Sequence, residues 1–167
     1  MGTFKIDVDN LAWIKGDADD PENLCLHGHA TVFIGTRKFE YDATVSATAL
    51  YLLKTLTEDH IMNQDNQMLP CCGHFIIPND TLDNVTIIGC DNGIDWSVLH
   101  QGDSVILELD DSTREAIPLF EYKDEVFKFA DKIEEFYKQC SPQIISDDFE
   151  KDGYTAFWNE WHRRRNG

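Results

Sequence analysis

The sequence lacks any run of about 18 apolar residues, so it offers no candidate for a membrane-spanning helix. Its first ten residues, MGTFKIDVDN, have neither the basic start nor the apolar stretch of a secretion signal. A cytoplasmic location is therefore expected.

Positive charge is scarce. Lys and Arg total 14 against 31 Asp and Glu, a formal net charge of -17, and no Lys or Arg occurs between Lys54 and Arg114. A field of one sign repels phosphate backbones and anionic lipids, and it attracts basic proteins. We therefore expect no nucleic-acid or membrane partner, and a basic protein as partner.

The common catalytic motifs are missing as well. The chain contains no G-x-S-x-G, P-loop, G-x-G-x-x-G or H-E-x-x-H pattern. DNGID at residues 91–95 lacks the later oxygen ligands of a calcium loop. These absences predict a protein that is not an enzyme and binds no cofactor.

The cysteines do not form a disulfide pattern. There are five, an odd number at irregular spacing, which favours reduced thiols over the disulfide framework of a secreted protein. They are Cys25, Cys71, Cys72, Cys90 and Cys140.

The apolar periodicity predicts one α+β domain spanning residues 1–167. Residues 3–14 are expected to form a strand pair that turns at Asp9-Asn10, and DADDPEN a loop. Residues 24–34 and 39–45 alternate in polarity and predict a hairpin.

The later segments predict a helix near 47–59 with Ser46 as its N-cap, then four meander strands over about 85–120. Asn92-Gly93 favours a type I′ turn between two of these strands. Two C-terminal helices follow. The expected architecture is a mainly antiparallel sheet of about seven or eight strands, with one inserted helix and two C-terminal helices packed on it.

The first C-terminal helix is expected to run from Tyr122 until Pro142 stops it, and the second to begin near Asp147, with Glu150 at capping-box spacing. Four aromatic residues fall on one face of the second helix: Tyr154, Phe157, Trp158 and Trp161. Residues 163–165 are arginines, which suit the negative end of the helix dipole and can pair with acids elsewhere. The tail is therefore interpreted as a docked helix and not as a nucleic-acid hook.

Histidine and cysteine leave a metal site open as an alternative. The residues that could assemble a zinc site are Cys25, His27, His29, Cys71, Cys72 and His74. Their spacing matches no established zinc pattern, so ordinary thiols and hydrogen-bonded imidazoles are the competing interpretation.

The cation-free residues 55–113 are predicted to form a coherent negative face that contacts the partner. The acids assigned to this contact are Asp80, Asp83, Asp91, Asp95, Asp103, Glu108, Asp110 and Asp111. The oligomeric state stays open. A competing interpretation is a structural or regulatory domain whose charge only maintains solubility.

DEVFKFADKIEEFYKQC followed by DDFEKDGYTAFWNEWHRRR, within a small and very acidic chain, resembles the immunity proteins of bacterial polymorphic-toxin systems. The resemblance implies a cytoplasmic α+β domain that neutralises a cognate toxin. In that case its acids imitate the charge of the toxin's natural ligand or cover the toxin's basic cleft.

Overall fold

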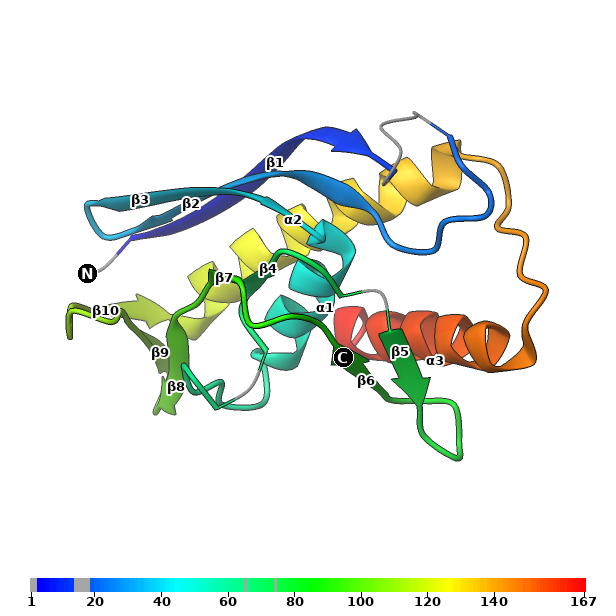
Figure 1. Ribbon diagram of the computed structural model, residues 1–167. Helices are drawn as coiled ribbons and strands as arrows, with labels where there is room; N and C mark the ends of the chain where they lie inside the picture. The colour runs from blue at the N-terminus through cyan, green and yellow to red at the C-terminus, as the bar shows by residue number, and fades with distance from the viewer. Residues whose placement is uncertain (1–2, 14–18, 65, 74) are drawn as a thin grey trace.

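The computed structural model describes residues 3–13, 19–64, 66–73 and 75–167, and the α+β class is confirmed. Three helices and ten strands are present in these residues (Figure 1). All strand pairs are antiparallel, and they form two three-stranded and two two-stranded sheets where one larger sheet was expected.

The first sheet has the order β1-β2-β3, with β1 Phe4–Ala12, β2 His27–Ile34 and β3 Arg37–Ala43. The predicted β2-β3 hairpin is confirmed. The strand pair expected within residues 3–14 is wrong, because β1 runs on to Ala12 through a bulge after Asp9 in which Asn10 takes a φ of 52°. A single residue with positive φ lets one strand bend without reversing. Ile14 lies outside the described residues.

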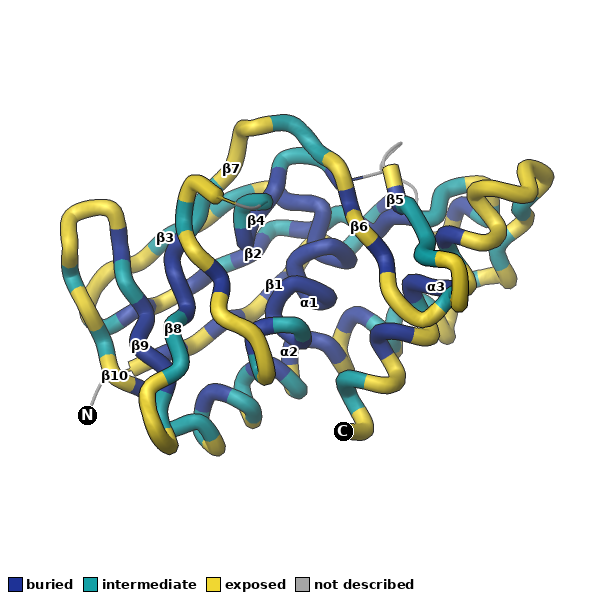
Figure 2. The backbone as a smooth tube through the Cα atoms, turned by 90° about the horizontal axis from the view of Figure 1, so that it is seen from below, coloured by how far each residue is buried: buried dark blue, intermediate teal, exposed yellow. Residues whose placement is uncertain are grey.

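Helix α1, Val45–Lys54, forms the centre of the core. Its residues Val45 to Leu53 are all buried, and it contacts β2, β4, α2 and α3 (Figure 2). The predicted span of 47–59 extends too far, because the chain leaves the helix at Thr55, whose hydroxyl donates to the Leu52 carbonyl at 2.6 Å. Ser46 is not the N-cap: Thr44 takes that position, and the Ser46 hydroxyl accepts from the Leu26 N–H.

The middle of the chain forms two short sheets. β4 Leu69–Pro70 pairs with β7 Gly93–Ile94, and β5 Phe75–Pro78 pairs with β6 Val85–Ile88. The type I′ hairpin predicted at Asn92-Gly93 is therefore wrong. The Asn92 carbonyl accepts from the Cys71 N–H, and Gly93 pairs with Pro70, so a distant segment replaces the local turn.

The second three-stranded sheet contains β8 Ser97–Gln101, β9 Ser104–Glu108 and β10 Arg114–Pro118, in the order β10-β9-β8. These are three of the four strands predicted as a meander; the fourth, β6, pairs with β5 instead. Strand β5 offers β6 a fully paired register from Phe75↔Ile88 to Pro78↔Val85.

The two C-terminal helices are α2, Leu119–Gln139, and α3, Asp148–Arg165. Helix α2 packs on β1, and α3 packs on β5 and β6 (Figure 1). Of the predicted aromatic face of α3, Phe157 and Trp161 are buried and Tyr154 and Trp158 are partly buried. The interpretation of the tail as a docked helix is confirmed.

Two of the three terminal arginines pair with acids of the molecule, as expected. Arg164 contacts Glu160 at 2.7 Å and Glu58 at 2.5 Å, and Arg165 contacts Asp131 at 2.7 Å.

Among residues 3–13, 19–64, 66–73 and 75–167, no helix combines the length and the apolar composition that crossing a bilayer requires.

Candidate functional site

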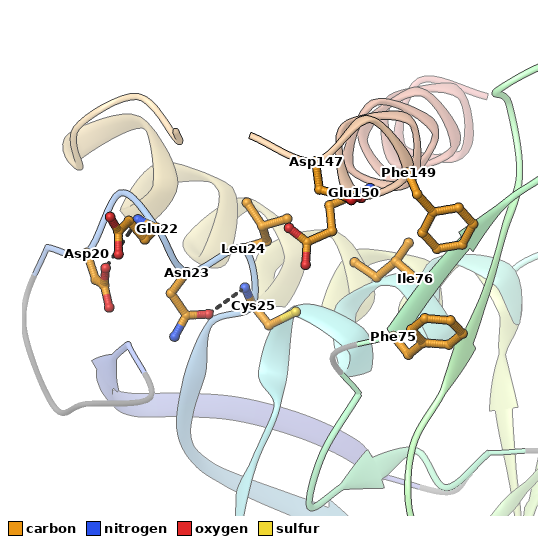
Figure 3. A pocket seen from close by; sticks show the side chains of 10 residues that line it. All are labelled: Asp20, Glu22, Asn23, Leu24, Cys25, Phe75, Ile76, Asp147, Phe149 and Glu150. Atoms are coloured by element: carbon orange, nitrogen blue, oxygen red, sulfur yellow. Dashed lines mark hydrogen bonds between the residues drawn. The ribbon is translucent and has the colours of Figure 1, made fainter. Parts of the chain in front are cut away.

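A cleft of about 510 Å³ opens where three segments meet: the loop before β2, strand β5 and the first turn of α3 (Figure 3). Its lining residues are Asp20, Glu22, Asn23, Leu24, Cys25, Phe75, Ile76, Asp147, Phe149 and Glu150. We refer to these ten residues as the acidic cleft. Four of them carry carboxylates, and none of these described lining residues is a lysine or arginine.

One wall of the cleft is built by the start of α3. The Asp147 carboxylate accepts from the Glu150 N–H at 2.9 Å, which confirms the predicted cap. Gly153 lets this helix lie directly on β5, because a Cβ there would come within 2.6 Å of the Ile76 carbonyl oxygen. The helix N-terminus also favours the negative charge of Asp147 and Glu150.

The opposite wall is the loop that precedes β2. The Pro21 carbonyl accepts from the Ile144 N–H at 2.7 Å, and the Leu24 carbonyl accepts from the Tyr137 hydroxyl at 2.7 Å. Inside the loop, the Asp20 carboxylate accepts from the Glu22 N–H. The loop is therefore fixed to the end of α2 and to the segment after it.

Two phenylalanines give the cleft an apolar side. The rings of Phe75 and Phe149 stack with their centroids 5.7 Å apart, and their exposed fractions are 52% and 45%. Figure 3 shows the Glu150 carboxylate between these rings and the loop acids Asp20 and Glu22. The cleft thus presents carboxylates beside an exposed aromatic surface.

Cys25 gives the cleft a thiol but no thiolate. Burial, and secondarily the charge of Glu150, raise the pKa of Cys25 to about 12. Its sulfur contacts the Gly73 carbonyl at 3.6 Å. The thiol stays protonated near neutral pH, so it does not supply the anionic nucleophile that thiol catalysis needs.

Seven of the eight acids predicted as partner contacts are distributed over five different connections, and the eighth, Glu108, is the last residue of β9. Asp80 and Asp83 lie between β5 and β6, Asp91 between β6 and β7, and Asp95 between β7 and β8. The remaining four, Asp103, Glu108, Asp110 and Asp111, lie at the two ends of β9. The five residues of that strand separate its ends by about 17 Å.

Several of these carboxylates already have partners in the fold. Asp95 contacts the His60 ring at 2.8 Å and accepts from the Met68 N–H. Glu108 pairs with Arg114, and Asp111 with Arg37. The structure does not assemble the eight acids into one coherent face; the contact role of the individual residues stays a prediction.

Sequence reasoning missed the acidic cleft. Asp147 and Glu150 were recognised only as helix-capping residues, and Asp20 and Glu22 only as part of a polar loop. The available signal was that each segment carries several acids and no cation over 17–23 and 147–150. Nothing local in the sequence indicates that the two segments meet.

The predicted metal ligands do not assemble as a set. Among the described residues, three sulfurs gather, those of Cys71, Cys72 and Cys90, and Cys25, His27 and His29 are not part of this group. His74 lies outside the described residues.

The expectation that all five cysteines are reduced is wrong, because the structure contains a Cys71–Cys90 disulfide. The pairing of β4 with β7 brings these two residues together, which the spacing along the chain does not indicate.

His29 contacts carboxylates across the β2-β3 hairpin. Its Nδ1 lies 2.7 Å from Asp42 and its Nε2 lies 3.4 Å from Glu40. Hydrogen bonding to Asp42, and then to Glu40, raises the pKa of His29 above its ordinary value of 6.5. His29 is therefore a member of a surface ion-pair cluster.

We expect His29→Gln to reduce stability at acidic pH and to have little effect at alkaline pH. A histidine whose pKa is raised by folding contributes its full stabilisation below 6.5, and this contribution disappears as the pH rises through the raised pKa of the folded state. Thermal unfolding of the unmodified chain and of His29→Gln, from acidic to alkaline pH, measures the difference in stability between them. An equal difference at every pH would contradict the assignment.

The comparisons with known proteins add no relative. No protein-family model matches the chain, and no curated protein or solved structure shows significant similarity to it.

Proposed function

We propose that this chain is a non-enzymatic module that binds a basic protein, and that the acidic cleft receives a lysine or arginine side chain of that partner. One observation carries the proposal. Four carboxylates and two exposed, stacked phenylalanines share a single cleft whose described lining contains no cation.

The two kinds of surface in the cleft match the two parts of a basic side chain. The aliphatic stem of lysine or arginine packs on apolar surface while its charged head contacts carboxylates. An arginine guanidinium also stacks favourably on an aromatic ring. Phe75 and Phe149 offer the ring surface, and Glu22 and Glu150 offer exposed carboxylates.

The net charge of -17 supports the same class of partner. A field of one sign increases the rate of encounter with a cationic protein and makes the rate sensitive to salt. An immunity protein that neutralises a basic toxin is the specific form of this proposal. The eight acids outside the cleft then contribute to the long-range field.

We expect the double variant Glu22→Gln/Glu150→Gln to bind a fluorescent octa-arginine peptide about tenfold more weakly than the unmodified chain, a loss of about 1.4 kcal/mol. Each of the two exposed charge pairs that are removed contributes about 1 kcal/mol or less. The matched control is Asp103→Asn/Asp110→Asn, which removes the same charge from exposed positions outside the lining of the cleft. Fluorescence anisotropy at physiological salt measures both. If both variants weakened peptide binding equally, the attraction would be a general effect of charge, and binding in the acidic cleft would be contradicted.

The aromatic side of the cleft is tested separately. Phe149→Ala is expected to weaken peptide binding, whereas Phe120→Ala, which removes another exposed ring at the start of α2, is expected to leave it unchanged. Titration of the labelled peptide gives both affinities, and the thermal midpoints confirm that the variants are folded. Unchanged affinity of the Phe149 variant would show that the rings are not part of the binding site.

A further inference from the structure

Three cysteine sulfurs meet where β4 and β7 pair, outside the residues of the acidic cleft. The sulfur atoms of Cys71, Cys72 and Cys90 all lie within 4.8 Å of one another. Cys71 and Cys90 form the disulfide, and Cys72 remains a thiol beside it. The three side chains are partly exposed, so small solutes can reach them.

The backbone of both segments brings these sulfurs together. The Cys71 N–H donates to the Asn92 carbonyl at 3.1 Å, which continues the β4-β7 pairing. Gly89 permits the close approach on one side, because a Cβ there would lie 2.4 Å from the Cys72 carbonyl oxygen. Gly93 does the same on the other side, where a Cβ would lie 2.4 Å from the Leu69 carbonyl oxygen.

Cys72 is oriented by a contact from the opposite segment. The Cys90 N–H donates to the Cys72 sulfur at 2.9 Å. Hydrogen bonds of this kind orient metal-bound thiolates and are part of the surroundings of metal sites in proteins. The position of the third sulfur therefore depends on the fold as well as on its own side chain.

We propose that, when the Cys71–Cys90 disulfide is reduced, these three cysteines bind one zinc ion. Zn–S bonds of about 2.3 Å place tetrahedral ligand sulfurs roughly 3.8 Å apart. This separation fits the cluster, whose three sulfurs lie within 4.8 Å of one another. Three protein ligands and partial exposure leave a fourth position for water or a ligand. This inference does not depend on the proposed function, because it uses other residues.

A dithiol can reduce the Cys71–Cys90 disulfide. The dithiol transfers two electrons and two protons to the Cys71–Cys90 disulfide, which becomes two thiols, and the dithiol itself becomes a disulfide. Zinc then displaces the thiol protons, so binding is stronger at higher pH. Because the disulfide and the metal use the same sulfur atoms, thiol–disulfide exchange with the oxidised dithiol, which takes up the two electrons, re-forms Cys71–Cys90 and releases the ion.

The test uses the full chain, reduced with dithiothreitol and desalted without oxygen. We expect one zinc per chain after incubation with Zn²⁺ and gel filtration, measured by elemental mass spectrometry. Cys72→Ser is expected to retain at least tenfold less zinc at the same free Zn²⁺. Cys140→Ser, at the end of α2, is the matched control and is expected to retain as much as the unmodified chain.

Two further measurements separate zinc ligation from misfolding and from other ligand sets. Cys72 is outside the disulfide, so circular dichroism of oxidised Cys72→Ser reports its fold. In the unmodified reduced chain, zinc is expected to protect Cys71, Cys72 and Cys90 from iodoacetamide. The proposal is overturned if reduced protein retains no zinc, if Cys72→Ser retains it fully, or if these three thiols stay unprotected.

Discussion

Replacing Glu160 by alanine is expected to lower the free energy of unfolding by about 3–5 kcal/mol, the usual effect of removing one partner from a buried ion pair. The Glu160 side chain is fully buried in α3. One of its oxygens accepts from the Val85 N–H at 2.8 Å, and the other accepts from Arg164 at 2.7 Å. The ammonium of Lys54 lies 3.6 Å from the same carboxylate.

The large effect follows from what alanine leaves behind. The Val85 N–H would lose its acceptor, and the positive charges of Arg164 and Lys54 would lose their most buried counter-charge. Unpaired polar groups in a protein interior are costly because water cannot reach them. Urea denaturation monitored by tryptophan fluorescence measures the loss.

Glu58→Ala is the matched control for this prediction. Glu58 pairs with the same Arg164 guanidinium at 2.5 Å, but its side chain is 59% exposed. Exposed pairs contribute about 1 kcal/mol or less, because water and salt screen them. Similar losses for the two variants would show that Glu160 does not stabilise the fold through burial.

The second large effect is expected from Trp161→Ala, with a loss of about 3–5 kcal/mol. Trp161 is fully buried, and its ring lies 5.6 Å from the Phe157 ring and 4.9 Å from the Trp158 ring, measured between centroids. Alanine removes most of the side chain and leaves a cavity in the core. Thermal and urea denaturation give the change.

Phe149→Ala on the same helix provides the comparison. Its ring is 45% exposed at the edge of the acidic cleft, so its removal is expected to lower stability by about 1 kcal/mol or less. The comparison separates packing in the core from aromatic content in general. If both variants lost the same stability, the core position assigned to Trp161 would be wrong.

The elements that the sequence predicted well are those determined by local patterns. Helix α2 ends at Gln139, three residues before Pro142, and the cap of α3 is at Asp147, as expected. The β2-β3 hairpin also follows from alternation within two neighbouring segments. In each case the determining interactions lie within a few residues along the chain.

The errors occurred where distant segments determine the local structure. Asn92-Gly93 is a favourable turn sequence, yet pairing with Leu69 and Pro70 takes precedence in the folded chain. The Ser46 hydroxyl contacts Leu26, a residue 20 positions away. Propensity describes the isolated segment, and tertiary contacts override it.

The acidic cleft was hidden for the same reason. The walls of the cleft come from residues 20–25, 75–76 and 147–150, which no sequence pattern connects. The cation-free segment 55–113 was conspicuous, but its acids are carried by separate turns. Net charge led to the expectation of a basic partner, which stays a prediction, whereas finding the cleft required the fold.

The central position of α1 has a consequence for synthesis of the chain. Its apolar residues are buried by β2, β4, α2 and α3, and the last of these partners, α3, begins only at Asp148, more than 90 positions later. At 5–20 residues per second, a ribosome needs roughly 5–20 s to make that stretch. During this interval α1 lacks its full cover, so the nascent chain is expected to depend on chaperones that shield hydrophobic segments.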